Sequence, residues 1–291
     1  MKSAFKYFFL WLILMIVGAT ISVLLIMVIA KPGEIQAVDE SALSSNPLFA
    51  SIILLGSDLL PLFVFWIMRY TRFNFKFDYD FGQDFSARKL YLWAAIGCIG
   101  LLLWDLALGE FIQFPDWDTD GLEILGDMAT NPVGIITICL SGPLLEEAVF
   151  RGAIERRLLE KNWNPWYAIV ISALFFAVAH FNFTQGLSAF MMGCFIGWVY
   201  YRTRNLWPCV LIHALNNTIA VVLMLLLEGT RFENAENMPL ACSLIMLIAG
   251  PVLIYFAAKG INALTRDRIP LARPEEAIAV DTVDEAPYPG E

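Results

Sequence analysis

Residues 132–151 read PVGIITICLSGPLLEEAVFR. This stretch has the length of a membrane-spanning helix, which needs roughly 20 predominantly apolar residues. It nevertheless carries two adjacent carboxylates, Glu146 and Glu147, and ends on Arg151. A charged side chain at the centre of a membrane helix costs at least about 2.5–3.5 kcal/mol, so such residues are candidates for function. The stretch therefore predicts a membrane helix that also holds part of a functional site.

The composition of the whole chain is that of a membrane protein. Of its 291 residues 58% are hydrophobic and 16% are charged, whereas soluble chains have about 45–50% apolar and about 25% charged residues. Too little polar surface is present to cover a soluble domain of this size. The net charge of −9 argues against a nucleic-acid partner, because nucleic acids select basic surfaces. We expect an integral protein of the cell (inner) membrane.

Seven further stretches are apolar enough to span, so we expect an all-α, polytopic membrane helix bundle of about eight transmembrane helices. The predicted spans lie at about 7–30, 49–68, 90–112, 132–150, 165–182, 186–201, 206–227 and 239–261. They form one transmembrane helical domain, residues 1–264. Residues 265–291 are rich in proline and acidic side chains, which predicts a disordered cytoplasmic tail.

The basic residues predict the orientation of the bundle. All but two of the 19 Lys and Arg residues fall in the segments 1–6, 69–89, 151–164, 202–205 and 259–291. Lys and Arg in short loops stay on the cytoplasmic side, so both termini are expected in the cytoplasm. The fifth and sixth predicted spans are short, and the uncharged residues 182–186 between them predict a turn within the outer leaflet, surrounded by protein or by a cavity.

Helix geometry separates the roles of the two glutamates. Gly142 and Pro143 precede them and predict a bend that aims them into a cavity. Glu147 and Arg151 are four residues apart in the favoured order, which predicts an ion pair. Glu146 lies about 100° further round the helix, at 3.6 residues per turn, and is left free to hold water.

The chain has two histidines, and both fall in predicted spans. Phe176 precedes His180 by four residues, and Asn217 follows His213 by four, so each pair shares a helix face. Buried packing is the simpler interpretation of a single membrane histidine. Two histidines and a free carboxylate, however, are the parts of a hydrolytic site. The five cysteines show no spacing typical of a metal site or a disulfide framework.

Glu146-Glu147-x-x-x-Arg151, Phe176-x-x-x-His180 and His213-x-x-x-Asn217 together resemble the three ordered motifs of the CPBP family. These are the CAAX-processing and bacteriocin-processing (Abi) intramembrane proteases, which include the type II CAAX prenyl endopeptidases. The resemblance covers about residues 132–225. It implies an endopeptidase, active in protein maturation, that hydrolyses a peptide bond of a membrane-embedded or lipid-anchored peptide or protein. The sequence leaves the substrate open.

The resemblance also implies a role for each residue of the site. Glu146 would be the general base that activates water, and His180 would hold that water. His213 and Asn217 would stabilise the oxyanion, although Asn216 could take the place of Asn217. Glu147 and Arg151 would support them.

Metal dependence is open at this stage. Glu146, His180 and His213 could supply the ligands of a hydrolytic zinc site, as in a metalloprotease. The same residues suffice for a metal-free glutamate mechanism, which we favour. Counting about 1.5 Å per residue places His213 about 10 Å inside the cytoplasmic boundary of its span. We therefore expect the cavity to open toward the cytoplasmic leaflet.

Two other functions compete with the protease. Asp58, Asp105 and Glu110 are further carboxylates in predicted spans, and buried carboxylates are typical of secondary transporters. Transporters usually have paired internal repeats, and the glutamate pair and the histidines are not repeated. The second rival is a family member that acts as a bacteriocin-immunity or scaffold protein without cleaving. The intact set of motifs argues against it, because a scaffold does not need histidines in the membrane.

Overall fold

The fold is a bundle of helices, as expected. The computed structural model describes residues 2–29, 46–71, 73, 77, 79–112, 120–181, 183–227, 238–266 and 269–270. Within this part of the chain the exceptions to helix and loop are two short strands, β1 (Tyr79–Asp80) and β2 (Ile269–Pro270), which pair antiparallel. Apart from residues 265–266 and β2, the predicted tail 265–291 lies outside the described residues.

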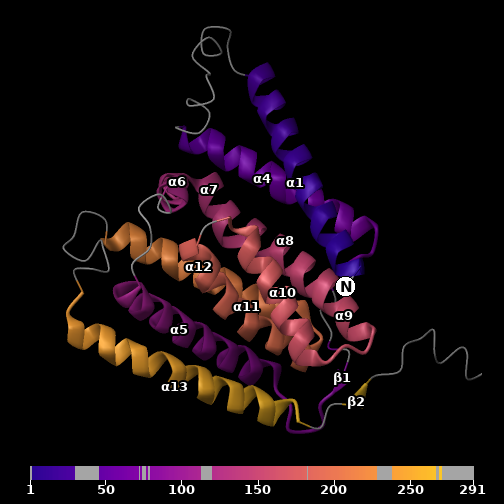
Figure 1. Cartoon of the computed structure of the whole chain (residues 1–291), viewed down its shortest axis with the longest axis vertical. Helices are drawn as coiled ribbons and strands as arrows, with labels where there is room; N and C mark the ends of the chain where they lie inside the picture. The colour runs from indigo at the N-terminus through magenta and orange to yellow at the C-terminus, as the bar shows by residue number, and fades with distance from the viewer. Residues whose placement is uncertain are drawn as a thin grey trace, which may run out of the picture.

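Every predicted span corresponds to a helical segment (Figure 1). The helices are α1 (Lys2–Ile29), α4 (Pro47–Ile67), α5 (Ala87–Phe111), the short α6 (Asp120–Met128), a composite segment from Pro132 to Glu160, α10 (Pro165–Ala179), α11 (Phe183–Thr203), α12 (Leu206–Leu227) and α13 (Leu240–Leu264). Six of these segments are long and apolar enough to cross a membrane; α10, with 15 residues, is shorter, and α11 is not among the six. The all-α membrane bundle is confirmed.

The predicted connection at 182–186 is wrong in its extent. Asn182 lies outside the described residues, and Phe183 to Gly186 form the first turn of α11, so this span has 21 residues and is not short. Thr184 and Gln185 line the cavity described below. Their polarity therefore reflects the lining of a cavity inside the bundle, whereas the sequence pattern suggested a turn.

The composite segment that carries the glutamates is α-helical with two π-helical interruptions. It runs as α7 (Pro132–Ile136), a π-helical stretch from Thr137 to Ser141, α8 (Gly142–Val149), a second π-helical stretch from Phe150 to Glu155, and α9 (Arg156–Glu160). Asn131 caps its start by accepting a hydrogen bond from the Gly134 amide at 3.0 Å. Short π-helical stretches occur frequently at functional sites. Here they lie immediately before and after the turns that hold Glu146 and Glu147.

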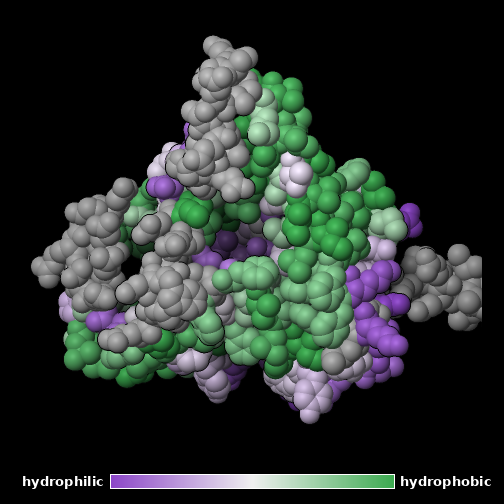
Figure 2. All heavy atoms as spheres, turned by 45° about the horizontal axis from the view of Figure 1, so that its top comes forward, coloured by the Kyte–Doolittle hydropathy of each residue, from purple (hydrophilic) through white to green (hydrophobic). Residues whose placement is uncertain are grey.

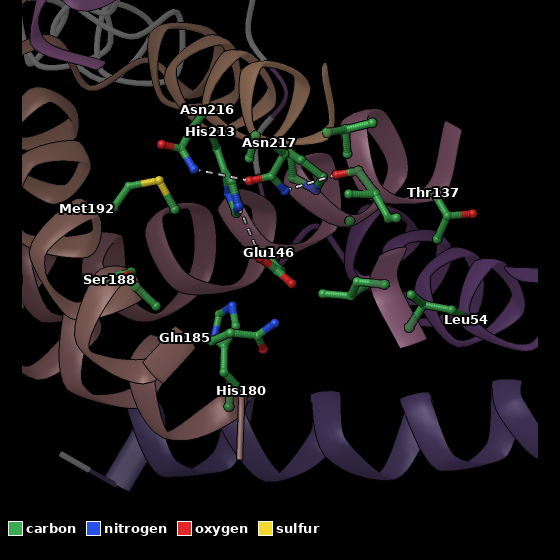
Figure 3. A pocket seen from close by; sticks show the side chains of 18 of the residues that line it. Leu54, Thr137, Glu146, His180, Gln185, Ser188, Met192, His213, Asn216 and Asn217 are labelled. Atoms are coloured by element: carbon green, nitrogen blue, oxygen red, sulfur yellow. Dashed lines mark hydrogen bonds and ion pairs between the residues drawn. The ribbon is translucent and has the colours of Figure 1, made fainter. Parts of the chain in front are cut away.

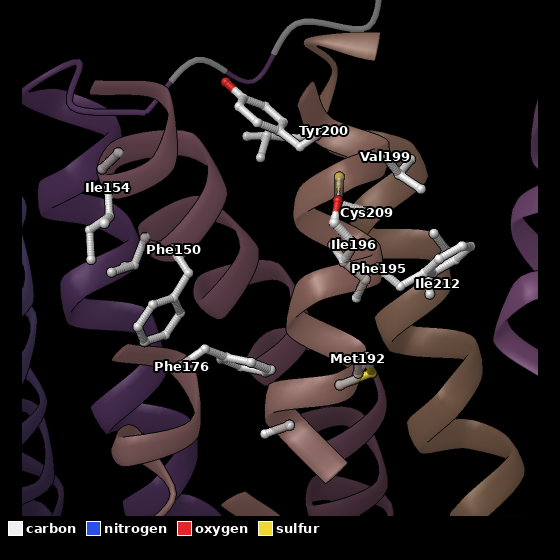
Figure 4. Close-up of a cluster of buried hydrophobic side chains, with 14 of the residues drawn as sticks. Phe150, Ile154, Phe176, Met192, Phe195, Ile196, Val199, Tyr200, Cys209 and Ile212 are labelled. Atoms are coloured by element: carbon white, nitrogen blue, oxygen red, sulfur yellow. Dashed lines mark hydrogen bonds between the residues drawn. The ribbon is translucent and has the colours of Figure 1, made fainter. Parts of the chain in front are cut away.

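Glycines allow two helix pairs to approach closely. A Cβ at Gly250 of α13 would lie 2.7 Å from the carbonyl oxygen of Gly100 of α5. A Cβ at Gly18 of α1 would lie 2.4 Å from the carbonyl oxygen of Gly56 of α4. Close contact between helix backbones through small residues is how membrane helices commonly associate. A cluster of buried apolar side chains lies between the second π-helical stretch, α10, α11 and α12 (Figure 4), and α1, α4, α5 and α13 also contribute residues to it.

Candidate active site

The centre of the site is a chain of buried polar side chains that joins two helices. Arg151 Nη1 lies 3.0 Å from Glu147 Oε1, which confirms the predicted ion pair. The same oxygen lies 2.9 Å from Nδ1 of His213 on α12. Glu147 and Arg151 are fully buried, and His213 is 2% exposed. Arg151 also donates to the carbonyl of Gly193 at 3.1 Å, and its guanidinium lies 4.7 Å from the centre of the Phe176 ring.

This chain of contacts orients His213. Its Nδ1 faces the buried carboxylate of Glu147, so the other ring nitrogen, Nε2, is the one that reaches Glu146, at 3.5 Å from Oε2. Glu146 has a side chain that is 27% exposed, in contrast to the fully buried Glu147. The side chains of the two adjacent glutamates thus point in different directions, as their helical positions predict. Glu147 holds Arg151 and His213, and Glu146 faces the cavity.

His180 comes from the end of α10, on the other side of Glu146 in Figure 3. Its Nδ1 lies 2.9 Å from the carbonyl oxygen of Phe176, so Nδ1 donates and Nε2 is left for the cavity. The Phe176 ring packs edge-on against His180 at 5.0 Å and against His213 at 5.5 Å between ring centres. Phe176 therefore contacts both imidazoles of the site, which accounts for its place in the motif.

The two asparagines of α12 lie beside His213. Asn217 Nδ2 donates to the carbonyl of Ile138 at 2.9 Å, within the first π-helical stretch. Asn216 Nδ2 donates to Asn217 Oδ1 at 3.4 Å. Both asparagines line the cavity. Asn217 thus ties α12 to the segment that carries the glutamates, and its part in binding an oxyanion stays a prediction.

A cavity of about 660 Å³ brings the predicted residues together. Glu146, His180 and His213 line it together with Asn216 and Asn217 (Figure 3). Its wall also includes two carboxylates that the sequence analysis attributed to a rival function, Asp58 and Asp105, whereas Glu110 does not line it.

Both wall carboxylates have a serine partner. Ser141 donates to Asp58 at 2.8 Å, and Ser188 donates to Asp105. Neither serine was predicted. A signal was present in the sequence, since both are polar residues in otherwise apolar stretches, but serine is common in membrane helices and one such residue does not indicate a site.

The proposed zinc ligands do not form a metal site as they are placed. Among the described residues, no three His, Cys, Asp or Glu side chains are arranged to hold a metal ion. Nδ1 of His213 is bonded to Glu147 and Nδ1 of His180 to a backbone carbonyl, which leaves Nε2 of each ring available, as in metal-binding histidines. The choice between the zinc site and the metal-free mechanism therefore stays a prediction.

The cavity extends from the catalytic residues away from the basic segments, and the predicted opening toward the cytoplasmic leaflet stays a prediction. The lining residues of α5, α11 and α12 include Asp105, Thr184 and Met224, which lie in the halves of these helices far from the basic segments. The prediction rested on the depth of His213 alone. That depth places one wall residue, but it does not tell on which side of the residue the bundle is hollow.

A match to a known family spans the segment that carries the site residues. Residues 129–219 match the family model of type II CAAX prenyl endopeptidase Rce1-like proteins. The chain is 26% identical over 231 residues to YdiL of Bacillus subtilis (strain 168), described as a candidate membrane peptidase, which covers 77% of this chain and 91% of that one.

A second relative matches over a shorter stretch. The chain is 36% identical over 100 residues to the membrane-embedded CAAX protease MroQ of Staphylococcus aureus (strain USA300), which covers 33% of this chain and 40% of that one. No solved structure matches the chain.

Proposed function

We propose that this chain, whose residues 129–219 match the family model of type II CAAX prenyl endopeptidase Rce1-like proteins, is an intramembrane endopeptidase in which Glu146 activates the attacking water. One observation carries the proposal. His213 is held between two carboxylates, with Nδ1 at 2.9 Å from the buried Glu147 and Nε2 at 3.5 Å from the cavity-facing Glu146. Two carboxylates in different environments are typical of hydrolytic sites, where one carboxylate orients a neighbouring catalytic group and the other transfers protons.

The first step is the activation of water. The Glu146 carboxylate accepts a proton from a water molecule, and the water oxygen attacks the carbonyl carbon of the peptide bond. His180 presents Nε2 to the same cavity, because its Nδ1 donates to the carbonyl of Phe176. This nitrogen accepts or donates a hydrogen bond to the attacking water and so orients it. General base catalysis by a positioned side chain contributes about 10²–10⁴-fold to a rate.

The second step is the collapse of the tetrahedral intermediate. His213, when protonated on Nε2, and an amide of Asn217 or Asn216 donate hydrogen bonds to the oxyanion, whose stabilisation is often the largest contribution to catalysis. Glu146 then returns its proton to the leaving nitrogen as the carbon–nitrogen bond breaks. Glu147 and Arg151 contact no substrate in this scheme. They position His213, and they are buried so that its ring cannot turn.

We propose a metal-free reaction, because the residues present supply a base, a water-positioning group and oxyanion donors without a metal ion. The proposed substrate is a membrane-embedded or lipid-anchored peptide or protein. MroQ is named a CAAX protease, and its similarity supports cleavage of such a chain during protein maturation. The proposed location is the cell membrane with both termini in the cytoplasm, which the distribution of basic residues supports.

The test is the exchange of Glu146 for its amide. Membrane peptides from cells that express wild-type protein or the Glu146→Gln variant are compared by mass spectrometry, and the peptides that change serve as substrates for purified protein in liposomes. We expect Glu146→Gln to reduce cleavage by at least about 10²-fold, because the amide cannot accept the proton of water. The matched control is Glu160→Gln, a partly exposed surface carboxylate of α9.

Retention of cleavage by folded Glu146→Gln protein contradicts the proposal. Uptake of a solute by liposomes that contain wild-type protein, without cleavage of any peptide, favours the transporter instead. Protection against a peptide toxin that survives the Glu146→Gln exchange favours the non-cleaving scaffold.

A further inference from the structure

Arg151 lies in a narrow slot between α10 and α11. On the α10 side, the centre of the Phe176 ring lies 4.7 Å from the guanidinium carbon. On the α11 side, the Gly193 carbonyl accepts a hydrogen bond from Arg151 Nη2 at 3.1 Å. Arg151 is fully buried, and its Nη1 lies 3.0 Å from Glu147 Oε1. The guanidinium is therefore held by an aromatic ring, a backbone carbonyl and a carboxylate.

Gly193 leaves the space that the guanidinium occupies. A Cβ at this position would lie 3.2 Å from Arg151 Nη2 and 3.0 Å from the Cβ of Ala173 on α10. The best separation of two non-bonded carbon atoms is about 3.5–4.0 Å, so a side chain here would displace its neighbours by a few tenths of an ångström. Because interior side chains pack closely, that displacement would move the guanidinium or separate α10 from α11.

Gly197, four residues further along α11, provides a comparison. A Cβ there would lie 2.8 Å from Glu155 Oε2 and 3.2 Å from Ile169 of α10. Glu155 is fully buried, and among the described residues neither oxygen of its carboxylate has a hydrogen-bond partner. The two glycines have the spacing that often brings membrane helices close together. Both therefore serve the packing of α10 against α11, but of the two it is Gly193 that also binds a side chain of the site.

A chain of contacts connects Gly193 to the cavity. Glu147 Oε1, which binds Arg151, is the same oxygen that lies 2.9 Å from His213 Nδ1. His213 Nε2 in turn lies 3.5 Å from Glu146, which lines the cavity. Figure 2 shows hydrophilic residues at the bottom of a hollow between apolar surfaces, which is the composition expected of such a site. A shift of the guanidinium would move the shared oxygen of Glu147, and with it the His213 imidazole.

We infer that Gly193 is a positioning residue. The backbone of α11 at Gly193 fixes the Arg151 guanidinium, and through Glu147 it fixes the ring of His213. For the reaction, the inference rests on the proposed endopeptidase function. A misplacement of about 1 Å caused far from the reacting atoms can cost about 10²-fold in rate, so a shift of a few tenths of an ångström should cost about tenfold in kcat. KM should stay within about twofold, because neither Gly193 nor Arg151 is among the described residues that line the cavity.

Histidine-selective isotope labelling tests the inference without any substrate. The chain has two histidines, so the imidazole NMR signals of labelled protein in detergent belong to His180 and His213, and a His180→Gln variant assigns them. The variant to test is Gly193→Ala. The matched control is Gly197→Ala, since both add one methyl group between α10 and α11. We expect Gly193→Ala to shift the signals of the His213 ring, because its hydrogen bond to Glu147 changes, and Gly197→Ala to leave them in place.

A second substitution, Ala173→Gly, separates the effect on the guanidinium from the effect on helix spacing. Combined with Gly193→Ala, it removes the nearest contact of the new methyl group, at 3.0 Å, and leaves the contact with Arg151 Nη2 at 3.2 Å. We expect the His213 signals to stay shifted in this double variant. Where Gly193→Ala alone does not fold, the double variant takes its place in the comparison.

Cleavage of the peptides identified with Glu146→Gln is then measured for each variant. We expect Gly193→Ala to lower kcat about tenfold with KM within about twofold, and Gly197→Ala to change kcat by less than about twofold. The inference is overturned if the His213 signals of Gly193→Ala match those of the wild type, if Gly197→Ala shifts them equally, or if Ala173→Gly restores them. It is also overturned if kcat of Gly193→Ala equals that of the wild type, or if neither Gly193→Ala nor the double variant folds.

The NMR signals do not depend on cleavage. A wild-type protein that cleaves no peptide therefore contradicts the proposed function, whereas the His213 signals still decide whether Gly193 positions the ring.

Discussion

The buried contacts of Arg151 predict a large and specific loss of stability. Its side chain is fully buried, and it binds Glu147 at 3.0 Å and the carbonyl of Gly193 at 3.1 Å. The Arg151→Met variant keeps an unbranched apolar stem and removes the charged guanidinium. Among the described residues, the carboxylate of Glu147 is then left in the interior with His213 as its remaining hydrogen-bond partner.

The magnitude follows from burial. Removal of one partner of a buried ion pair costs about 3–5 kcal/mol, because the other charge is left without compensation. Arg157→Met is the matched control, since Arg157 is 46% exposed and pairs with Glu160 at 3.1 Å. Exposed pairs contribute about 0–1 kcal/mol. Because about 1 kcal/mol shifts Tm by about 2–4 °C in a chain of 150–250 residues, we expect Arg151→Met to lower Tm by roughly 6–20 °C.

A double variant separates stability from activity. Glu147→Gln combined with Arg151→Met removes both charges, and replacement of a complete buried pair by neutral side chains is often neutral for stability. We therefore expect Tm to recover toward that of the wild type. Cleavage should not recover, because an amide next to the catalytic imidazole cannot fix the ring as a carboxylate does, a change that costs about 10⁴-fold in a serine protease.

The assay is thermal unfolding of purified protein in detergent, followed by tryptophan fluorescence and by the monodisperse fraction after heating. Two results would refute the reasoning. One is a Tm for Arg151→Met that is as high as that of Arg157→Met. The other is a double variant that is as unstable as Arg151→Met alone, which would mean that the shape of the arginine matters and its charge does not.

Two further pairs of variants test packing and hydrogen bonding by the same measurement. Gly250→Ala should lower Tm, because its Cβ would lie 2.7 Å from a backbone carbonyl of α5, whereas Gly109→Ala meets nothing within 4 Å and should gain about 0.5–1 kcal/mol. Ser141→Ala removes the hydroxyl bonded to Asp58 and should cost about 1–3 kcal/mol, whereas Ser243→Ala removes a buried hydroxyl that has no hydrogen-bond partner and should cost nothing. An equal effect within either pair would contradict the corresponding argument.

Local geometry made part of the site predictable. Glu147 and Arg151 are four residues apart on one helix, so their ion pair follows from helical spacing alone. The separation of Glu146 from that pair follows for the same reason. The contact between Glu147 and His213 joins residues 66 apart in sequence. No periodicity within either helix indicates it, because it depends on how α8 and α12 pack against each other.

The direction of the cavity also depends on packing. The sequence predicts the depth of His213 within its span. It does not predict which apolar residues near His213 pack in the core and which line a cavity, because Val199 and Met224 are both apolar. In the structure Val199 is fully buried in the core, whereas Met224 lines the cavity. The polar residues at the start of α11 line the cavity, as expected for a segment surrounded by protein or by a cavity, but they form a helical turn and not a connection between helices. A polar residue in a membrane chain faces either water or a cavity, and the sequence does not distinguish the two.

The carboxylates that favoured a transporter are better explained by the same cavity. Asp58 and Asp105 line it with Glu146, and each accepts a hydrogen bond from a serine of another segment. Asp58 binds Ser141, the last residue of the π-helical stretch that precedes the glutamates. It therefore holds in place the turn on which Glu146 depends. Transporter sites are usually built at the interface of paired repeats, whereas here Asp58 and Asp105 both belong to the walls around one glutamate and two histidines, an arrangement that agrees with the proposed hydrolytic site.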